Sequence, residues 1–340
     1  MVLKPLVTMC RKGQLPLLLR LSKDTKRLYR LCFVATAGKN GLLTALADGP
    51  VSFDRLAGEF CRDDDGAEAL EAWLELGLHL GELTLGEDGY AACGYSKKLL
   101  QAGNDPVLAM IEETVFLHIP LILKTPTRLR QGEKWRLEDQ DGEMIARSSR
   151  ILEPFQIEAI DRFFPAGNPV RLLEVGCGSG IYVRYAARKN PGLSAVCVEL
   201  QEEVAEMARR NFETWGLTLR AVVEHSDIRD KTPEASFDIV TLYNNIYYFP
   251  VDERLALLTH LLAFLKPGGM LLLTTCCKGG GPTTDVLNLW GAATSGCGGL
   301  PKSGELENQL QEAGFTGIRV KNLLPGESFY AFAAHRSAVC

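Results

Sequence analysis

The stretch that decides the fold is 170-VRLLEVGCGSGIYVRYAARK-189. It begins with a run of apolar residues, passes through glycines at positions 176, 178 and 180, and continues with an amphipathic helical pattern. Glycines at a strand-to-helix turn let the backbone approach a ligand where a Cβ atom would collide with it. The stretch therefore predicts the first strand of an α/β sheet, followed by a ligand-binding turn and a helix.

The same alternation continues toward the C-terminus. Apolar segments such as "SAVCVEL" and "FDIVTLY" alternate with helical patterns such as "EVAEMARRNFETW" and "ERLALLTHLLAFL". Strands that are apolar at consecutive positions are typical of a parallel sheet covered by helices on both faces. The tail, "SGELENQLQEAGFTGIRVKNLLPGESFYAFAAHR", predicts one more helix and two more strands. We expect this α/β domain to cover residues 166–340.

The first part of the chain follows a different pattern. Residues 1–104 predict helices and a hairpin at 81-GELTLGEDGYAA-92, and the order helix, turn, helix, hairpin is typical of a winged-helix domain. The helix expected over residues 67–80 carries three Glu and neither Lys nor Arg, which disfavours binding of this helix to DNA. Residues 105–165 predict helix throughout and form a connector between the two domains.

Composition limits the possible partners. The 340 residues carry a formal net charge of -5, so the chain has no overall basic field for nucleic acid. Residues 1–40 nevertheless hold nine Lys or Arg and one acid, which suits an anionic surface, an acidic partner or a solvated helix in a subunit interface. We find neither a secretory signal nor an apolar run of about 18 residues that would span a bilayer. Ten widely spaced cysteines without a C-x-x-C pair indicate reduced cytoplasmic thiols and no metal site.

Acidic residues accompany the glycine turn. Glu174 precedes the glycines, Glu199 ends the second strand in "VCVEL", and Asp227 follows the third strand in "HSDIRD". The third glycine of a dinucleotide fingerprint would fall on Ile181, which disfavours NAD. With "FLKPGGMLLLTT" before the fifth strand, the set resembles the class I S-adenosylmethionine (SAM)-dependent methyltransferases over residues 170–275. The resemblance implies a Rossmann-like, seven-stranded methyltransferase sheet.

The resemblance also implies roles for residues at the cofactor. The turn of Gly176, Gly178 and Gly180 would lie against the methionine and ribose portions of SAM. Glu199 would accept hydrogen bonds from both ribose hydroxyls, and Leu200 would lie beside it. The adenine would be contacted by Asp227 and Ile228, and the methionine ammonium would lie near Glu174, directly or through water.

The layout of the whole chain resembles the small-molecule O-methyltransferases related to plant and antibiotic-tailoring enzymes. A mainly helical winged-helix domain, a helical connector that contributes to the substrate pocket, and a C-terminal cofactor domain follow one another in that group. The resemblance implies that the winged-helix part makes a homodimer and that the methyl acceptor is a small molecule rather than a nucleic acid.

The segment 244-NNIYYFP-250 follows the fourth strand, at the sheet edge where open α/β sheets bind ligands. Asn244 or Asn245 is a candidate to hold the carboxylate of the cofactor or an oxygen of the substrate. Tyr247 and Tyr248 are candidate catalytic hydroxyls or ring walls, since each ring face attracts a sulfonium by about 0.5–2 kcal/mol. Trp290, in the glycine-rich segment after the fifth strand, is a candidate substrate contact, with core packing as the alternative.

The general base is the least determined part of the site. Plant-like members carry a catalytic His after the fifth strand, where this chain has Cys276, Cys277 and Lys278. His118 in "VFLHIP" is the candidate base or substrate contact, with a buried structural histidine as the alternative. Arg147 is a candidate contact for an acidic substrate, with surface charge as the alternative.

Several acceptors and one different function remain compatible with these residues. We expect methyl transfer to an oxygen or a sulfur of a small molecule. One alternative is S-methylation of a thioether acid of the methylthio-hydroxybutyrate type, on the route to dimethylsulfoniopropionate, because a thioether needs no deprotonation. A SAM-sensing winged-helix regulator is the alternative of another class.

Overall fold

The computed structural model describes residues 3–165, 167–324 and 326–338. The chain forms two compact units, Met1–Ile119 and Pro120–Cys340. The boundary between them lies inside the expected connector, residues 105–165. The expected three-part division into 1–104, 105–165 and 166–340 stays a prediction.

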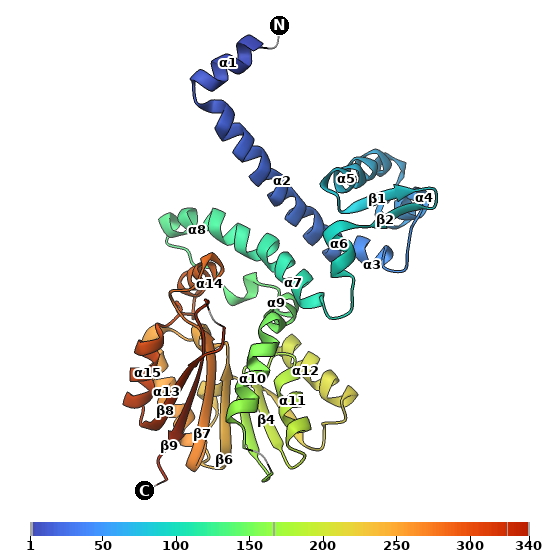
Figure 1. Ribbon diagram of the computed structural model, residues 1–340. Coiled ribbons are helices and arrows are strands. Elements are labelled where there is room, and N and C mark those ends of the chain that lie inside the picture. Colours follow the sequence, from blue (N-terminus) through green and yellow to red (C-terminus); the bar gives the residue numbers. More distant parts are fainter. Residues whose placement is uncertain (1–2, 166, 325, 339–340) are drawn as a thin grey trace. The chain divides into compact units, whose positions relative to one another are not determined.

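The first unit is mainly helical (Figure 1). A hairpin of β1 (Leu83–Gly86) and antiparallel β2 (Gly89–Ala92) follows its fifth helix. The hairpin and the helix over 67–80 confirm the sequence prediction, and the winged-helix assignment stays a prediction. The helices of this unit are α1 (Leu3–Arg11), α2 (Gln14–Lys39), α3 (Leu42–Ala45), α4 (Phe53–Phe60), α5 (Ala67–Leu80), α6 (Gly94–Leu99) and α7 (Asp105–Glu113), and a π-helical turn covers Thr114–His118.

One continuous helical stretch, Asp105–Gln131, bears on the expectation that no segment spans a bilayer, which stays a prediction. Its most apolar 18-residue window has a mean hydropathy of 1.6, so by length and composition it is able to cross a membrane. Charged residues interrupt the apolar residues of this stretch, so the sequence shows no unbroken apolar run. In the structure 44% of this window is buried inside the protein.

The second unit contains a seven-stranded sheet with the order β5-β4-β3-β6-β7-β9-β8. The pairs among β5, β4, β3, β6 and β7 are parallel, whereas β9 is antiparallel to both β7 and β8. The predicted α/β sheet is confirmed. Its strands are β3 (Arg171–Val175), β4 (Ser194–Glu199), β5 (Ala221–His225), β6 (Phe237–Tyr243), β7 (Leu265–Cys276), β8 (Phe315–Asn322) and β9 (Phe329–Arg336).

Helices cover both faces of this sheet (Figure 1). On one face α10 (Glu153–Phe163), α11 (Ile181–Lys189) and α12 (Glu202–Thr214) bury apolar side chains against the strands. On the other face α13 (Arg254–Phe264) and α15 (Ser303–Glu312) do the same. The remaining helices of the unit are α8 (Ile119–Gln131), α9 (Gly142–Ser148) and α14 (Pro282–Ala293).

The prediction of helix throughout 105–165 is wrong at residues 132–141, where the described structure holds only a 3₁₀ turn at Leu137–Asp139. Gly132, with φ of 71°, ends the preceding helix. Trp135 then pairs with the segment after α14: its N–H donates to Ala293 O at 2.9 Å, and its carbonyl accepts from Ser295 N at 2.7 Å. These long-range bonds satisfy the backbone outside a helix.

Candidate active site

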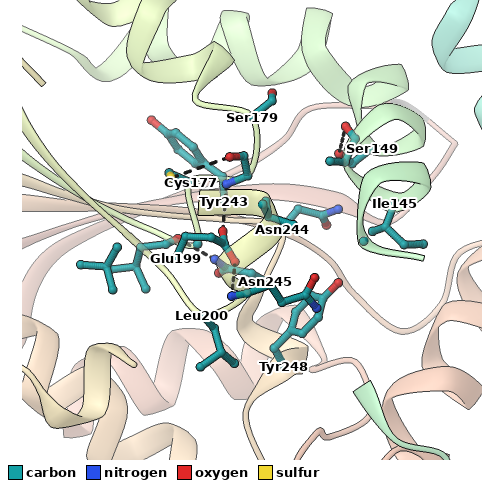
Figure 2. Close-up of a pocket in the computed structure, with 18 of the residues that line it drawn as sticks. Ile145, Ser149, Cys177, Ser179, Glu199, Leu200, Tyr243, Asn244, Asn245 and Tyr248 are labelled. Atoms are coloured by element: carbon teal, nitrogen blue, oxygen red, sulfur yellow. Dashed lines mark hydrogen bonds between the residues drawn. The ribbon is translucent and has the colours of Figure 1, made fainter. Parts of the chain in front are cut away.

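A cavity lies at the carboxyl edge of β3, β4 and β6, entirely within the second unit (Figure 2). The turns after β3, β4, β5 and β6 line it, together with residues of α9 and α10 and of the 3₁₀ turn between them. The strand order places the turns after β3, β4 and β6 side by side, although their sequences are separated by helices. The lining includes Ile145, Ser149, Arg150, Gln156, Gly176, Cys177, Gly178, Ser179, Tyr182, Glu199, Leu200, Ser226, Asp227, Ile228, Arg229, Tyr243, Asn244, Asn245, Tyr247, Tyr248 and Phe329.

The glycine turn needs glycine for different reasons at its three positions. Gly176, Gly178 and Gly180 all have positive φ, at 67°, 54° and 75°. A Cβ on Gly176 would lie 2.2 Å from Asn245 Nδ2, and one on Gly180 would lie 2.3 Å from the ring of Phe212. A Cβ on Gly178 would meet no atom within 4 Å, since this glycine borders the cavity. The turn is therefore packed against the protein at both ends and open in the middle.

Glu199 ends β4 and holds the glycine turn in place (Figure 2). Its Oε2 accepts from the N–H of Gly178 at 3.0 Å, and its Oε1 accepts from the N–H of Gln201 at 3.2 Å. Burial raises the pKa of this carboxyl, and the backbone donors oppose that rise. Leu200 follows it on the cavity wall and is 46% exposed. The position suits a two-oxygen acceptor at the ribose, the role implied by the sequence.

Asp227 lies at the start of the turn after β5 and is paired with Arg229. The guanidinium of Arg229 donates to both carboxylate oxygens, with Nη2 at 2.6 Å from Oδ2. Burial acts to raise the pKa of Asp227, but hydrogen bonds from Arg229 outweigh it and lower that pKa. Ile228 is 3% exposed and lines the cavity beside it. An ionised acceptor next to an apolar surface suits an adenine amino group and ring.

Glu174 is buried in β3, at 2% exposure, and is not among the described residues that line the cavity. No ion pair forms at its carboxyl within the described part of the chain. Burial raises the pKa of Glu174 to about 8, and a hydrogen bond from Thr241 opposes the rise. A cation close to a carboxyl with such a pKa would strongly stabilise its charged form.

The side chains of the two asparagines after β6 form hydrogen bonds with the backbone. Asn244 has φ of 53°, the single positive φ of a non-glycine residue in the described chain, and its Oδ1 faces the N–H of Cys276 at 3.4 Å. Asn245 donates from Nδ2 to Val175 O at 2.6 Å and so ties β6 to the glycine turn (Figure 2). Asn tolerates the left-handed region better than most residues. The structure thus accounts for both amides as parts of the site's frame.

Three aromatic rings pack together beside the cavity. Tyr247 and Tyr248 stack with ring centroids 5.2 Å apart, and both line the cavity. Trp290 contacts both of them edge-on, at 6.0 and 5.1 Å, and is 4% exposed. Trp290 is not among the described lining residues, so it supports the two tyrosines from behind. The aromatic wall predicted from "NNIYYFP" is therefore backed by α14.

Two buried polar atoms at the cavity, Ser226 Oγ and Asn245 Oδ1, have no hydrogen-bond partner within the described residues, whereas the hydroxyl of Tyr243 interacts with the side chains of Thr241 and Gln156. A buried polar atom without a partner costs about 1–3 kcal/mol, so two of them at one cavity indicate a polar ligand. With the open glycine at 178 and the acceptors Glu199 and Asp227, these residues fit a nucleoside that carries further polar groups.

Gln156 was missed by sequence reasoning, although a signal for it existed. It shares one helix face with Ala159 and Ile160, both fully buried, at spacings of three and four residues. A glutamine on the apolar face of a core helix needs a partner, and here Oε1 accepts from Thr274 Oγ1 at 2.5 Å. Tyr182 of α11 was also missed, and it packs edge-on against Tyr243 at 5.4 Å.

Two other candidates lie away from the described lining. His118 belongs to the first unit, where its Nε2 is 3.0 Å from Oε1 of Glu113 and both side chains are buried. The cavity lining in the described residues does not include it. Arg147 in α9 also lies outside that lining, whereas Ile145 and Ser149, two residues on either side, are part of it. Their predicted roles remain untested predictions.

Comparison with known proteins identifies the family. A family model described as "Methyltransferase domain" matches residues 147–320, slightly more than half of the chain.

The chain belongs to the methyltransferase-domain family.

Curated relatives match this methyltransferase over part of its length. A probable fatty acid methyltransferase of Mycobacterium tuberculosis is 38% identical over 102 residues, which are 30% of this chain and 23% of that protein. A ubiquinone biosynthesis O-methyltransferase of Xanthomonas axonopodis is 30% identical over 134 residues, which are 39% of this chain and 53% of that protein. The matched region therefore spans less than two thirds of the length of these relatives.

Solved structures resemble this methyltransferase over nearly the whole chain. The mitomycin 7-O-methyltransferase MmcR is 17% identical with a TM-score of 0.77, and the similarity covers 96% of this chain and 100% of that one. At such identity the likeness concerns the fold, and it confirms the arrangement predicted from the glycine turn.

Proposed function

We propose that this chain is a SAM-dependent methyltransferase that moves a methyl group to an oxygen or sulfur of a small-molecule acceptor. The observation that carries the proposal is the glycine turn with Glu199: three positive-φ glycines, one open to the cavity, held by a buried carboxylate at the end of β4. Membership in the methyltransferase-domain family supports the proposal. The structure of human N-acetylserotonin methyltransferase, which was solved in complex with SAM, also supports it, because its fold is similar. The TM-score is 0.72 at 17% identity, and the similarity covers 95% of this chain and 98% of that one.

When bound, SAM supplies a methyl group made electrophilic by its sulfonium. The residues of this chain would hold the cofactor and position the acceptor. Glu199 and Asp227 would accept hydrogen bonds from ribose and adenine, and Ile228 would cover the adenine ring. The Tyr247–Tyr248 pair would offer aromatic rings to positive charge, worth about 0.5–2 kcal/mol each. Methyl transfer depends mainly on placing the nucleophile in line with the methyl group, so positioning of the acceptor would account for most of the rate acceleration.

His118 is our proposed general base. Its hydrogen-bonding distance to Glu113 supports this role, because a carboxylate at that distance fixes the orientation and tautomer of the imidazole ring. Arg147 is proposed as a contact for an acidic substrate. S-methylation of a thioether acid remains the alternative acceptor chemistry, and it would make His118 dispensable.

Binding and turnover test the proposal in two steps. Isothermal titration calorimetry is expected to show stoichiometric binding of SAM and S-adenosylhomocysteine, and Glu199→Ala is expected to weaken both at least tenfold. Incubation of the protein with methyl-labelled SAM and a cell extract then identifies the labelled acceptor. An absence of binding by the folded protein refutes the function outright, whereas binding without any labelled product favours the SAM-sensing regulator.

We also propose that the protein is a cytoplasmic homodimer formed through its N-terminal helices. Leu17, Leu21 and Leu28 share one face of α2 and are 68%, 58% and 44% exposed, so the described residues leave this apolar face largely uncovered. Sedimentation equilibrium at micromolar protein is expected to give the dimer mass, and Leu17→Lys with Leu21→Lys is expected to give the monomer mass. A wild-type protein that stays monomeric contradicts the proposal.

A further inference from the structure

Arg254, the first residue of α13, is buried without an acidic partner. Its side chain is 1% exposed, and it takes part in no ion pair within the described residues. Burial lowers the pKa of its guanidinium to about 10. The N-terminus of a helix also disfavours a cation, because the helix dipole is positive there. A charge buried at such a cost indicates that its hydrogen bonds matter to the fold or to the site.

The guanidinium joins two segments that are far apart in the sequence. Its Nε donates to Phe249 O at 3.2 Å, in the turn after β6, and its Nη2 donates to Gly299 O at 2.6 Å. Gly299 belongs to residues 294–300, which follow α14 and which we call the strap. The strap also contacts the turn directly, because Gly298 N donates to Tyr247 O at 2.9 Å. The guanidinium therefore fixes the strap against the turn that carries the tyrosine pair.

The strap and the turn approach each other too closely to admit a side chain between them. A Cβ on Gly298 would lie 2.8 Å from Arg254 Nη2. It would also lie 2.8 Å from Phe249 O and 2.9 Å from Val251 N. Gly298 is not among the described glycines with positive φ, so the close approach is what requires glycine at this position. Packing and hydrogen bonds thus fix the same contact.

This contact holds the backbone on both sides of Tyr248. Tyr247, Tyr248 and Phe249 belong to the cavity lining, whereas Arg254 is not among the described lining residues. Trp290, in the helix that leads into the strap, packs edge-on against both tyrosine rings. The pair is therefore held through its backbone by the guanidinium and the strap, and through its rings by the indole.

We propose that Arg254 is a positioning residue for methyl transfer: it holds the strap against the turn after β6 and so sets the position of the Tyr247 and Tyr248 rings beside the sulfonium. The proposal rests on the proposed function, which offers these rings to the positive charge of SAM. The guanidinium acts through the tyrosines, because it lies outside the described cavity lining. The proposed ribose and adenine contacts, Glu199 and Asp227, belong to other turns, so they stay in place when the guanidinium is removed.

Fluorine NMR of the protein labelled with fluorotyrosine reads the surroundings of each tyrosine ring. Arg254→Met removes the guanidinium and keeps a long apolar side chain in the buried site. The resonances of Tyr247 and Tyr248, assigned with Tyr247→Phe and Tyr248→Phe, are expected to shift in this variant while those of the remaining tyrosines stay in place. Arg254→Lys is expected to shift them as well, because an ammonium does not reproduce the fork of donors that reaches both carbonyls.

Calorimetry with SAM and S-adenosylhomocysteine compares two ligands that differ in one methyl group and its positive charge. Arg254→Met is expected to weaken SAM about three- to tenfold and S-adenosylhomocysteine less than about twofold, since only SAM is attracted by the tyrosine rings as a cation. With methyl-labelled SAM and the cell extract, the initial rate of transfer by this variant is expected to fall about 10- to 100-fold.

Gly298→Ala disturbs the same contact from the strap and keeps the test valid if Arg254→Met fails to fold. It is expected to reproduce the resonance shifts and the selective loss of SAM affinity. Gly304→Ala is the matched control, because a Cβ there would meet no heavy atom within 4 Å, and it is expected to behave as the wild type.

Unchanged Tyr247 and Tyr248 resonances in folded variants, or equal losses of affinity for SAM and S-adenosylhomocysteine, overturn the inference. A wild-type protein that binds neither ligand overturns the proposed function itself. A wild-type protein that binds both ligands, with Arg254 variants that match it in SAM affinity and in the rate of transfer, overturns only this inference.

Discussion

Replacing Gly176 by alanine tests how the glycine turn is fixed to the sheet. The new Cβ would lie 2.2 Å from Asn245 Nδ2, so the amide must leave its bond to Val175 O. The φ of 67° costs alanine about 1–2 kcal/mol, and a broken buried hydrogen bond costs about 1–3 kcal/mol. We therefore expect Gly176→Ala to lower the free energy of unfolding by about 2–5 kcal/mol.

Gly178→Ala is the matched control, because its φ of 54° is also positive but its Cβ would meet nothing within 4 Å. It is expected to lose only the conformational part, about 1–2 kcal/mol. Urea unfolding followed by circular dichroism measures both variants. In an Asn245→Ala background, the clash is absent and the cost of Gly176→Ala should fall to that of Gly178→Ala. Equal costs for the two single variants, or no change in that background, would refute the reasoning.

Three other outcomes follow from the geometry. The folded-state pKa of Glu174, about 8, lies above its ordinary value near 4.5, so its stabilising contribution is full below pH 4.5 and is lost as pH rises toward 8. Urea unfolding without ligand should therefore show a steeper loss of stability between pH 5.5 and 8.5 for the wild type than for Glu174→Gln, and parallel pH profiles contradict this. Trp290→Ala should lower the free energy of unfolding by about 3–5 kcal/mol, because the ring is 4% exposed against two tyrosines, and a loss below about 1 kcal/mol contradicts the packing role. His118→Gln should lower kcat with labelled acceptor about 100-fold at pH 7 and recover partly at high pH, whereas a pH-independent loss contradicts base catalysis.

The sequence by itself determined the sheet and the glycine turn, and it indicated that Glu199 and Asp227 lie close to that turn. These are local signals: apolar runs form strands, and glycines at 176, 178 and 180 permit the positive φ that the turn requires. Glu199 ends β4, and Asp227 comes two residues after the end of β5. The carboxyl ends of parallel strands meet at one edge of the sheet. Knowing the strands was therefore enough to place them together.

Only the tertiary structure decided the contacts of Asn245, Trp290 and Gln156. Asn245 bonds to Val175, 70 positions earlier, and Gln156 bonds to Thr274, 118 positions later. Trp290 packs behind Tyr247 and Tyr248 instead of lining the cavity. Beyond Gly132, which ends the helix locally, the segment at 132–141 is held by bonds between Trp135 and residues 293 and 295. Partners this distant are set by strand register and helix packing, which no local pattern of residue types encodes.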